Sequence, residues 1–157
     1  MKSFAQSLID CKVAIGVSLF EMDTIYFALC REFFQVSDLK QDTMLLSDTI
    51  AYVQSTYEYF SYLADGLEMT EHDTWAQKWA NFSDRLVCDL NIPLLYLIVI
   101  YRALNNVCRE LESLSIPTKF HRSLLDLFWR KINEANIEIM LIGSSYGRSE
   151  HSGNDEG

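Results

Sequence analysis

Glycine and proline are scarce over most of this 157-residue chain, and their scarcity limits what the chain can fold into. The whole sequence has 6 glycines and 2 prolines. Between Gly16 and Gly143, the only residues of either type are Gly66, Pro93 and Pro117. An all-β domain of this size needs many tight turns, which depend on glycine and proline. The sequence therefore predicts an all-α fold.

The net charge and the short apolar runs argue against a nucleic acid and a membrane as partners. Lysine and arginine number 13 against 22 aspartates and glutamates, a net charge of -9. Since phosphate backbones and anionic lipids bind clustered cations, we expect neither a nucleic acid nor a membrane partner. The longest uncharged apolar run, Leu90–Tyr101, is too short to span a bilayer. With no signal-peptide pattern and four cysteines outside any C-x-x-C motif, the prediction is a cytoplasmic protein.

Apolar residues three or four positions apart mark the predicted helices. A capping-box pattern at Thr70–Asp73 begins one of them, and Pro93 and Pro117 each favour a first helical turn. We expect six to eight helices and no sheet, in one domain over residues 1–146, with a disordered tail over 147–157. The predicted helices span about residues 3–14, 18–36, 48–63, 71–90, 93–114 and 117–142.

The last two predicted helices each carry an apolar seam with alternating steps of three and four residues, the pattern of helices that pack at a shallow angle. The seams could serve the core of one chain, or they could meet a partner. We predict a homodimer through these two helices, and an unknown protein partner. The expected interface residues are Leu97, Ile100, Leu104, Val107, Leu111, Leu125, Phe128, Ile132, Ala135 and Ile139.

Motifs for catalysis are missing from the sequence. The 3 histidines form no Glu-x-x-His or H-E-x-x-H pattern, and no Walker A, G-x-G-x-x-G or G-x-S-x-G sequence occurs. We expect no enzyme and no metal site. Aromatic residues make up 13% of the chain, enough either to pack the core or to wall a flat apolar pocket between helices. Tyr57, Phe82 and Tyr101 are the candidates for lining such a pocket.

The order of these segments resembles the globin-coupled sensors, haem domains at the N-terminus of bacterial oxygen-sensing diguanylate cyclases and chemotaxis transducers. Leu29–Phe34 looks like that family's second-helix motif, and Leu46–Gly66 like its short distal helix. Arg85–Pro93 looks like the proximal segment that leads into the long helix, and Ile132–Glu138 like the closing helix. The resemblance implies a globin-like helical fold, a dimer and a role in signal input.

The family's haem residues are replaced at the matching positions. Val87 stands at the position of the proximal histidine, and Phe34 at that of the distal tyrosine. Haem iron needs a ligand with a lone pair, and neither side chain supplies one. The resemblance therefore predicts a regulatory sensor-globin-like module that acts through dimerisation and protein contacts, with no cofactor. The alternative is a haem-binding gas sensor with unorthodox axial ligation.

Overall fold

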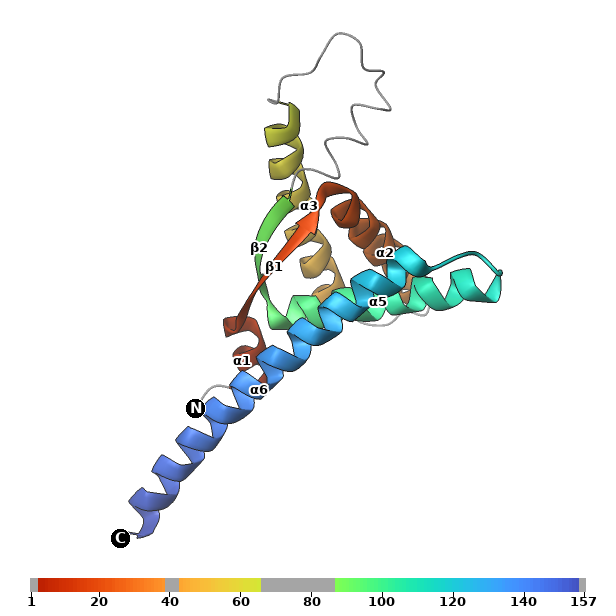
Figure 1. Cartoon of the computed structure of the whole chain (residues 1–157). Helices are drawn as coiled ribbons and strands as arrows, with labels where there is room; N and C mark the ends of the chain where they lie inside the picture. The colour runs from red at the N-terminus through yellow and green to blue at the C-terminus, as the bar shows by residue number, and fades with distance from the viewer. Residues whose placement is uncertain (1–2, 39–42, 66–86, 156–157) are drawn as a thin grey trace.

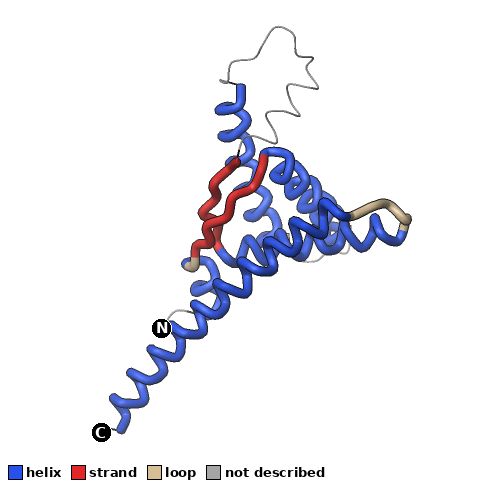
Figure 2. The backbone as a smooth tube through the Cα atoms, in the orientation of Figure 1, coloured by secondary structure: helices blue, strands red, loops and turns tan. Residues whose placement is uncertain are grey.

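The computed structural model describes residues 3–38, 43–65 and 87–155. In these ranges the chain forms five helices and a two-stranded sheet (Figures 1 and 2). The order along the chain is α1 (Phe4–Asp10), β1 (Lys12–Ser18), α2 (Leu19–Asp38), α3 (Met44–Asp65), β2 (Val87–Pro93), α5 (Leu94–Ser113) and α6 (Lys119–Asp155). The prediction of a mainly helical protein is confirmed. The prediction that it contains no sheet is wrong.

The sheet pairs two segments that are far apart in the sequence. Strands β1 and β2 run antiparallel, with Lys12 opposite Pro93 and Ser18 opposite Val87. In β1 the branched residues Val13, Ile15 and Val17 are buried and alternate with exposed residues. This period of two is the pattern of a strand with one covered face. The predicted helix 3–14 is therefore correct only over α1, because from Lys12 onward the alternation favours a strand.

Strand β2 corrects the predicted helix 71–90. Leu90 and Ile92 are buried while Asp89 and Asn91 are exposed, again a period of two. The part of that prediction before residue 87, which includes the Thr70–Asp73 cap, lies outside the described residues. Residues 87–90 were predicted as helix because Leu86 and Leu90 are four apart, a spacing that also fits a strand when its neighbours alternate.

Helix α5 lies at the centre of the fold. It contacts α1, α2, α3, α6 and β2. After a short connection, α6 turns back across α5 in the opposite general direction, and its C-terminal part projects away from the rest of the molecule (Figure 1). The predicted antiparallel pair of long helices is confirmed. The structure extends α6 to Asp155, beyond the predicted end near residue 142, and the disorder of 147–157 stays a prediction.

Both prolines lie just before a helix rather than inside its first turn. Pro93 is the last residue of β2 and the N-cap of α5. Pro117 precedes Thr118, whose carbonyl oxygen accepts the first bond of α6, 2.8 Å from the backbone nitrogen of Arg122. Proline has a fixed φ and no N–H, so it starts a helix without loss of a hydrogen bond. Apolar side chains from Leu8 to Ala135 form one buried cluster beneath these elements.

Candidate functional site

The outer face of α2 carries three exposed phenylalanines. Phe20, Phe27 and Phe34 are 46%, 62% and 70% exposed, and we call them the phenylalanine row. Seven residues make about two helical turns, so side chains at this spacing lie on one face. The opposite face of α2 is buried in the core by Leu19, Met22, Ile25, Ala28 and Leu29. Helix α2 therefore has two apolar faces, of which the fold covers one.

Aromatic contacts extend the phenylalanine row beyond α2. The ring of Phe20 meets the ring of Phe120, at the start of α6, edge-on with centroids 5.0 Å apart. At the other end, Phe34 lies edge-on to Phe33 at 6.4 Å. Phe120 is itself 38% exposed. The apolar surface thus continues from α2 onto the first turn of α6.

Charged side chains flank the centre of the row. Asp23 and Arg31 are exposed and lie four residues before and after Phe27. The Nε of Arg31 donates a hydrogen bond to Glu110 on α5, and Gln35 donates a second at 2.8 Å. These bonds lower the pKa of the Glu110 carboxyl, the one from Arg31 being the main cause. The ion pair with Glu110 holds the Arg31 side chain at the edge of the row.

A shallow hollow of about 380 Å³ opens beside Phe27. It contains an imidazole from His121, a thiol from Cys30 and a phenol from Tyr26, and Asp23 and Thr24 complete its lining. The hydrogen bond to Cys30 is the main cause that raises the pKa of Tyr26. Burial lowers the pKa of His121. Near neutral pH the hollow therefore presents an uncharged imidazole and an uncharged phenol.

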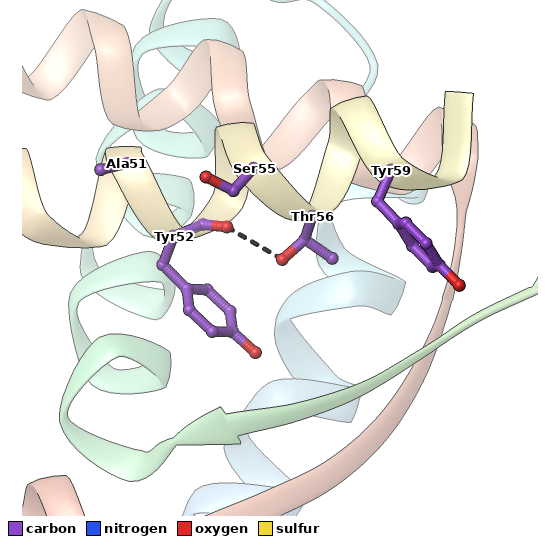
Figure 3. A pocket seen from close by; sticks show the side chains of 5 residues that line it. All are labelled: Ala51, Tyr52, Ser55, Thr56 and Tyr59. Atoms are coloured by element: carbon purple, nitrogen blue, oxygen red, sulfur yellow. Dashed lines mark hydrogen bonds between the residues drawn. The ribbon is translucent and has the colours of Figure 1, made fainter. Parts of the chain in front are cut away.

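A second hollow lies on α3, facing β2 (Figure 3). It is open, about 500 Å³ in volume, and lined by Ala51, Tyr52, Ser55, Thr56 and Tyr59. The hydroxyl of Thr56 donates to the carbonyl oxygen of Tyr52 at 2.9 Å, as the dashed line in Figure 3 marks. The hydroxyl of Tyr52 donates to the carbonyl oxygen of Asn91 at 3.3 Å. These bonds occupy the hydroxyls of Thr56 and Tyr52, and none of the five lining residues carries a charged side chain.

The two positions aligned with haem ligands lie on different elements. Phe34 belongs to the row on α2, and Val87 is the first residue of β2, 57% exposed. A Cβ added to Gly16 would lie 3.2 Å from Cγ1 of Val87, which places that side chain over the outer face of the sheet. The resemblance implies a helix at Val87, and the structure has a strand there. Neither residue lines the two hollows described above.

Of the predicted pocket-lining residues, Tyr57 and Tyr101 line neither of the two hollows described above. Tyr57 and Tyr101 are half-buried and pack against the core. The Tyr101 ring stacks on Trp129, with centroids 5.5 Å apart. Phe82 lies outside the described residues. Of the two uses considered for the aromatic side chains, packing fits Tyr57 and Tyr101.

Most residues of the two seams on the last two helices lie in the core of the single chain. Phe128 is 1% exposed and Leu104 is 0% exposed, so neither presents a surface to a partner. Leu111 is half-buried, and the side chain of Ile139 lies outside those described. The alternative in which the seams serve one chain's own core accounts for this burial. The predicted interface residues placed in that core are Leu97, Ile100, Leu104, Val107, Leu125, Phe128, Ile132 and Ala135.

Histidine, cysteine and acidic side chains nowhere gather in threes as a metal site would need, within residues 3–38, 43–65 and 87–155. Over the same part of the chain, each helix is too short or too polar to cross a bilayer.

No family model, no curated protein and no solved structure matches this chain. The phenylalanine row, and the hollow that Cys30 and His121 both line, were not predicted from the sequence. The seven-residue spacing of the three phenylalanines was a visible signal for the row. No sequence signal brings Cys30 close to His121, because that proximity depends on how α6 packs against α2.

Proposed function

We propose that this chain is a regulatory module that acts by contacting protein, without haem and without a catalytic step of its own. The phenylalanine row on α2 is the observation that carries the proposal. The likeness to the globin-coupled sensors supports a role in signal input, although the strand at Val87 departs from that family's helical proximal segment.

The physical argument concerns the exposed apolar surface of the row. Apolar area removed from water contributes roughly 25 cal/mol per Å². A contiguous exposed apolar patch marks an interaction site more often than scattered single residues do. Phenylalanine and arginine are enriched at the centres of protein interfaces. The row, with Arg31 beside Phe27, has this composition, and Phe120 enlarges it.

Site-specific photo-crosslinking tests this proposal. A benzophenone amino acid placed at position 27 or 34, in cells that produce the chain naturally, should yield a crosslinked protein product. Phe4 on α1 is the control position, because it is 73% exposed but lies on another element. Crosslinking to protein at positions 27 and 34, and not at 4, supports the proposal. Free chain alone at positions 27 and 34 would overturn it.

Haem binding with unorthodox ligation is the second candidate function. It is favoured by the hollow beside Phe27, because imidazole, thiolate and phenolate are all ligands that haem iron accepts. We expect purified protein titrated with haemin to show no sharp Soret band with defined axial ligation. A stoichiometric band that disappears in the variants His121→Ala or Cys30→Ser would replace the first proposal with this one.

A further inference from the structure

We propose that the phenylalanine row binds the same row of a second copy of this chain, with the two α2 helices antiparallel and crossing at Phe27. In this pairing Asp23 of each copy faces the partner's Arg31. The inference rests on the proposed function, since it names the protein that the row contacts.

The spacing of residues along α2 is symmetric about Phe27. Phe20 and Phe34 lie seven residues before and after it, and Asp23 and Arg31 lie four residues before and after it. A two-fold axis at Phe27, perpendicular to the helix, therefore places Phe20 of one copy opposite Phe34 of the other, and Asp23 opposite Arg31. Contacts between identical surfaces about such an axis are the commonest form of protein dimer.

Helix packing geometry brings the charged residues together. Residues four apart form ridges on a helix, and the commonest packing class aligns the ridges of two helices at a crossing angle of about −50°. Asp23, Phe27 and Arg31 form one such ridge on the exposed face of α2. When two copies of this ridge align in antiparallel order, each Asp23 lies beside the partner's Arg31, with Phe27 against Phe27 at the crossing point.

Charge decides between the two possible orientations. A parallel pair would set Asp23 against Asp23 and Arg31 against Arg31, and like charges at an interface disfavour association. In the antiparallel pair both contacts have opposite sign. Asp23 makes no hydrogen bond or ion pair with any described residue. Arg31 donates to Glu110 through Nε, which leaves its terminal amino groups for a second carboxylate.

The area of the row sets the expected strength of the dimer. Fully buried phenylalanines cover 150–250 Å² each, so the exposed fractions of these three offer on the order of 300–400 Å² per copy. Standard interfaces bury about 800 Å² per partner. The row covers about half of that area, so the dimer is a weak one that forms and dissociates as the concentration changes.

Sedimentation equilibrium on the full chain, from low micromolar to ~200 μM, measures this dimer. The variant Phe27→Asp should weaken dimerisation at least ~100-fold, because it places two carboxylates at the crossing point. Phe4→Asp, an equally exposed position on α1, should leave the dimer unchanged. Circular dichroism should show the same helicity for both variants and the wild type.

A charge exchange tests the antiparallel arrangement itself. Asp23→Arg and Arg31→Asp should each weaken dimerisation about tenfold. An equimolar mixture of the two variants should associate as tightly as the wild type, because both contacts then have opposite charges again. Asp48→Arg, the same charge change on α3, should have no effect. Single variants that associate as tightly as the wild type, or a mixture that associates no better than the single variants, would overturn the antiparallel arrangement.

The outcomes separate this inference from the function on which it rests. A wild-type chain that stays monomeric to ~200 μM, with a crosslink at position 27 to a different protein, would overturn the pairing and leave the proposed function standing. A crosslink between two copies supports both. The absence of any crosslink at positions 27 and 34 would overturn the proposed function, and a monomeric wild type would then overturn the pairing as well.

Discussion

Helices α2 and α5 carry apolar rows of the same spacing with opposite exposure. On α5, Leu97 and Leu104 are seven residues apart and are 1% and 0% exposed. On α2, Phe27 and Phe34 are also seven apart and are 62% and 70% exposed. Five elements contact α5, whereas the row side of α2 faces outward. Spacing therefore determines which side chains share a face, and the neighbouring elements determine whether that face is covered.

The two rows should also contribute to different properties, folding stability for the α5 row and association with a partner for the α2 row. A buried leucine contributes about 1.5–3 kcal/mol to folding relative to leaving it exposed. An exposed phenylalanine contributes little to folding and keeps most of its apolar surface for a partner. The α5 row should therefore control the free energy of unfolding, and the α2 row should control association.

The largest expected effect comes from placing a charge in each row. Leu104→Asp buries a carboxylate without a partner and should cost at least ~4 kcal/mol, a large part of a typical total stability. Phe27→Asp should change the free energy of unfolding by less than ~0.5 kcal/mol. Urea unfolding followed by circular dichroism, at a concentration where the chain is monomeric, measures both. Equal losses of stability in the two variants would show that the comparison is wrong.

The same contrast between buried and exposed positions occurs within β1, where exposure alternates from one residue to the next. Substitutions there should change the free energy of unfolding by a smaller amount. Ile15 is 5% exposed in β1, and its neighbour Ala14 is exposed. Ile15→Ala should cost about 2–4 kcal/mol, because it leaves a cavity in the core. Ala14→Thr should stay within ~0.5 kcal/mol, since threonine fits the exposed face of a strand. If Ala14→Thr were the more damaging of the two in urea unfolding, β1 would not have this register.

Much of the fold could be predicted from the sequence, since α2, α3, α5 and the first part of α6 have strong helical periodicity. The sheet could not, because each strand is only seven residues long and its partner lies far along the chain. Gly16 lies inside β1, where it is opposite Asp89 of β2. Val13, Ile15 and Val17 alternate as a strand does, but the predicted helix 3–14 was extended over the first of them, and the gap before the next predicted helix was assigned no strand.

The candidate site was less predictable than the fold. The resemblance aligned Val87 and Phe34 with the family's two haem residues, although neither side chain can bind iron, and the structure has them on β2 and α2, both exposed. The seams on α5 and α6 were predicted as a dimer interface because their spacing suits helix pairing, and that spacing suits an internal helix pair equally well. Only the placement of neighbours shows that α2 has an uncovered face and α5 does not.

The smallest predicted effect concerns His121, which is half-buried where the start of α6 lies beside the row. Burial lowers its pKa below the value of 6.5 that it has when unfolded, so the unfolded chain binds the proton more readily. The contribution of His121 to stability is therefore fully present above about pH 6.5 and decreases as the pH falls toward its lowered pKa in the folded chain. The variant His121→Gln removes this titration and should flatten the slope of unfolding free energy between about pH 7 and 5 relative to wild type.

His151→Gln is the matched control, a histidine change far from the row in the sequence. A slope unchanged by His121→Gln would mean that the edge of the row is as open as its centre, and that α6 covers less of α2 than Phe120 and His121 indicate.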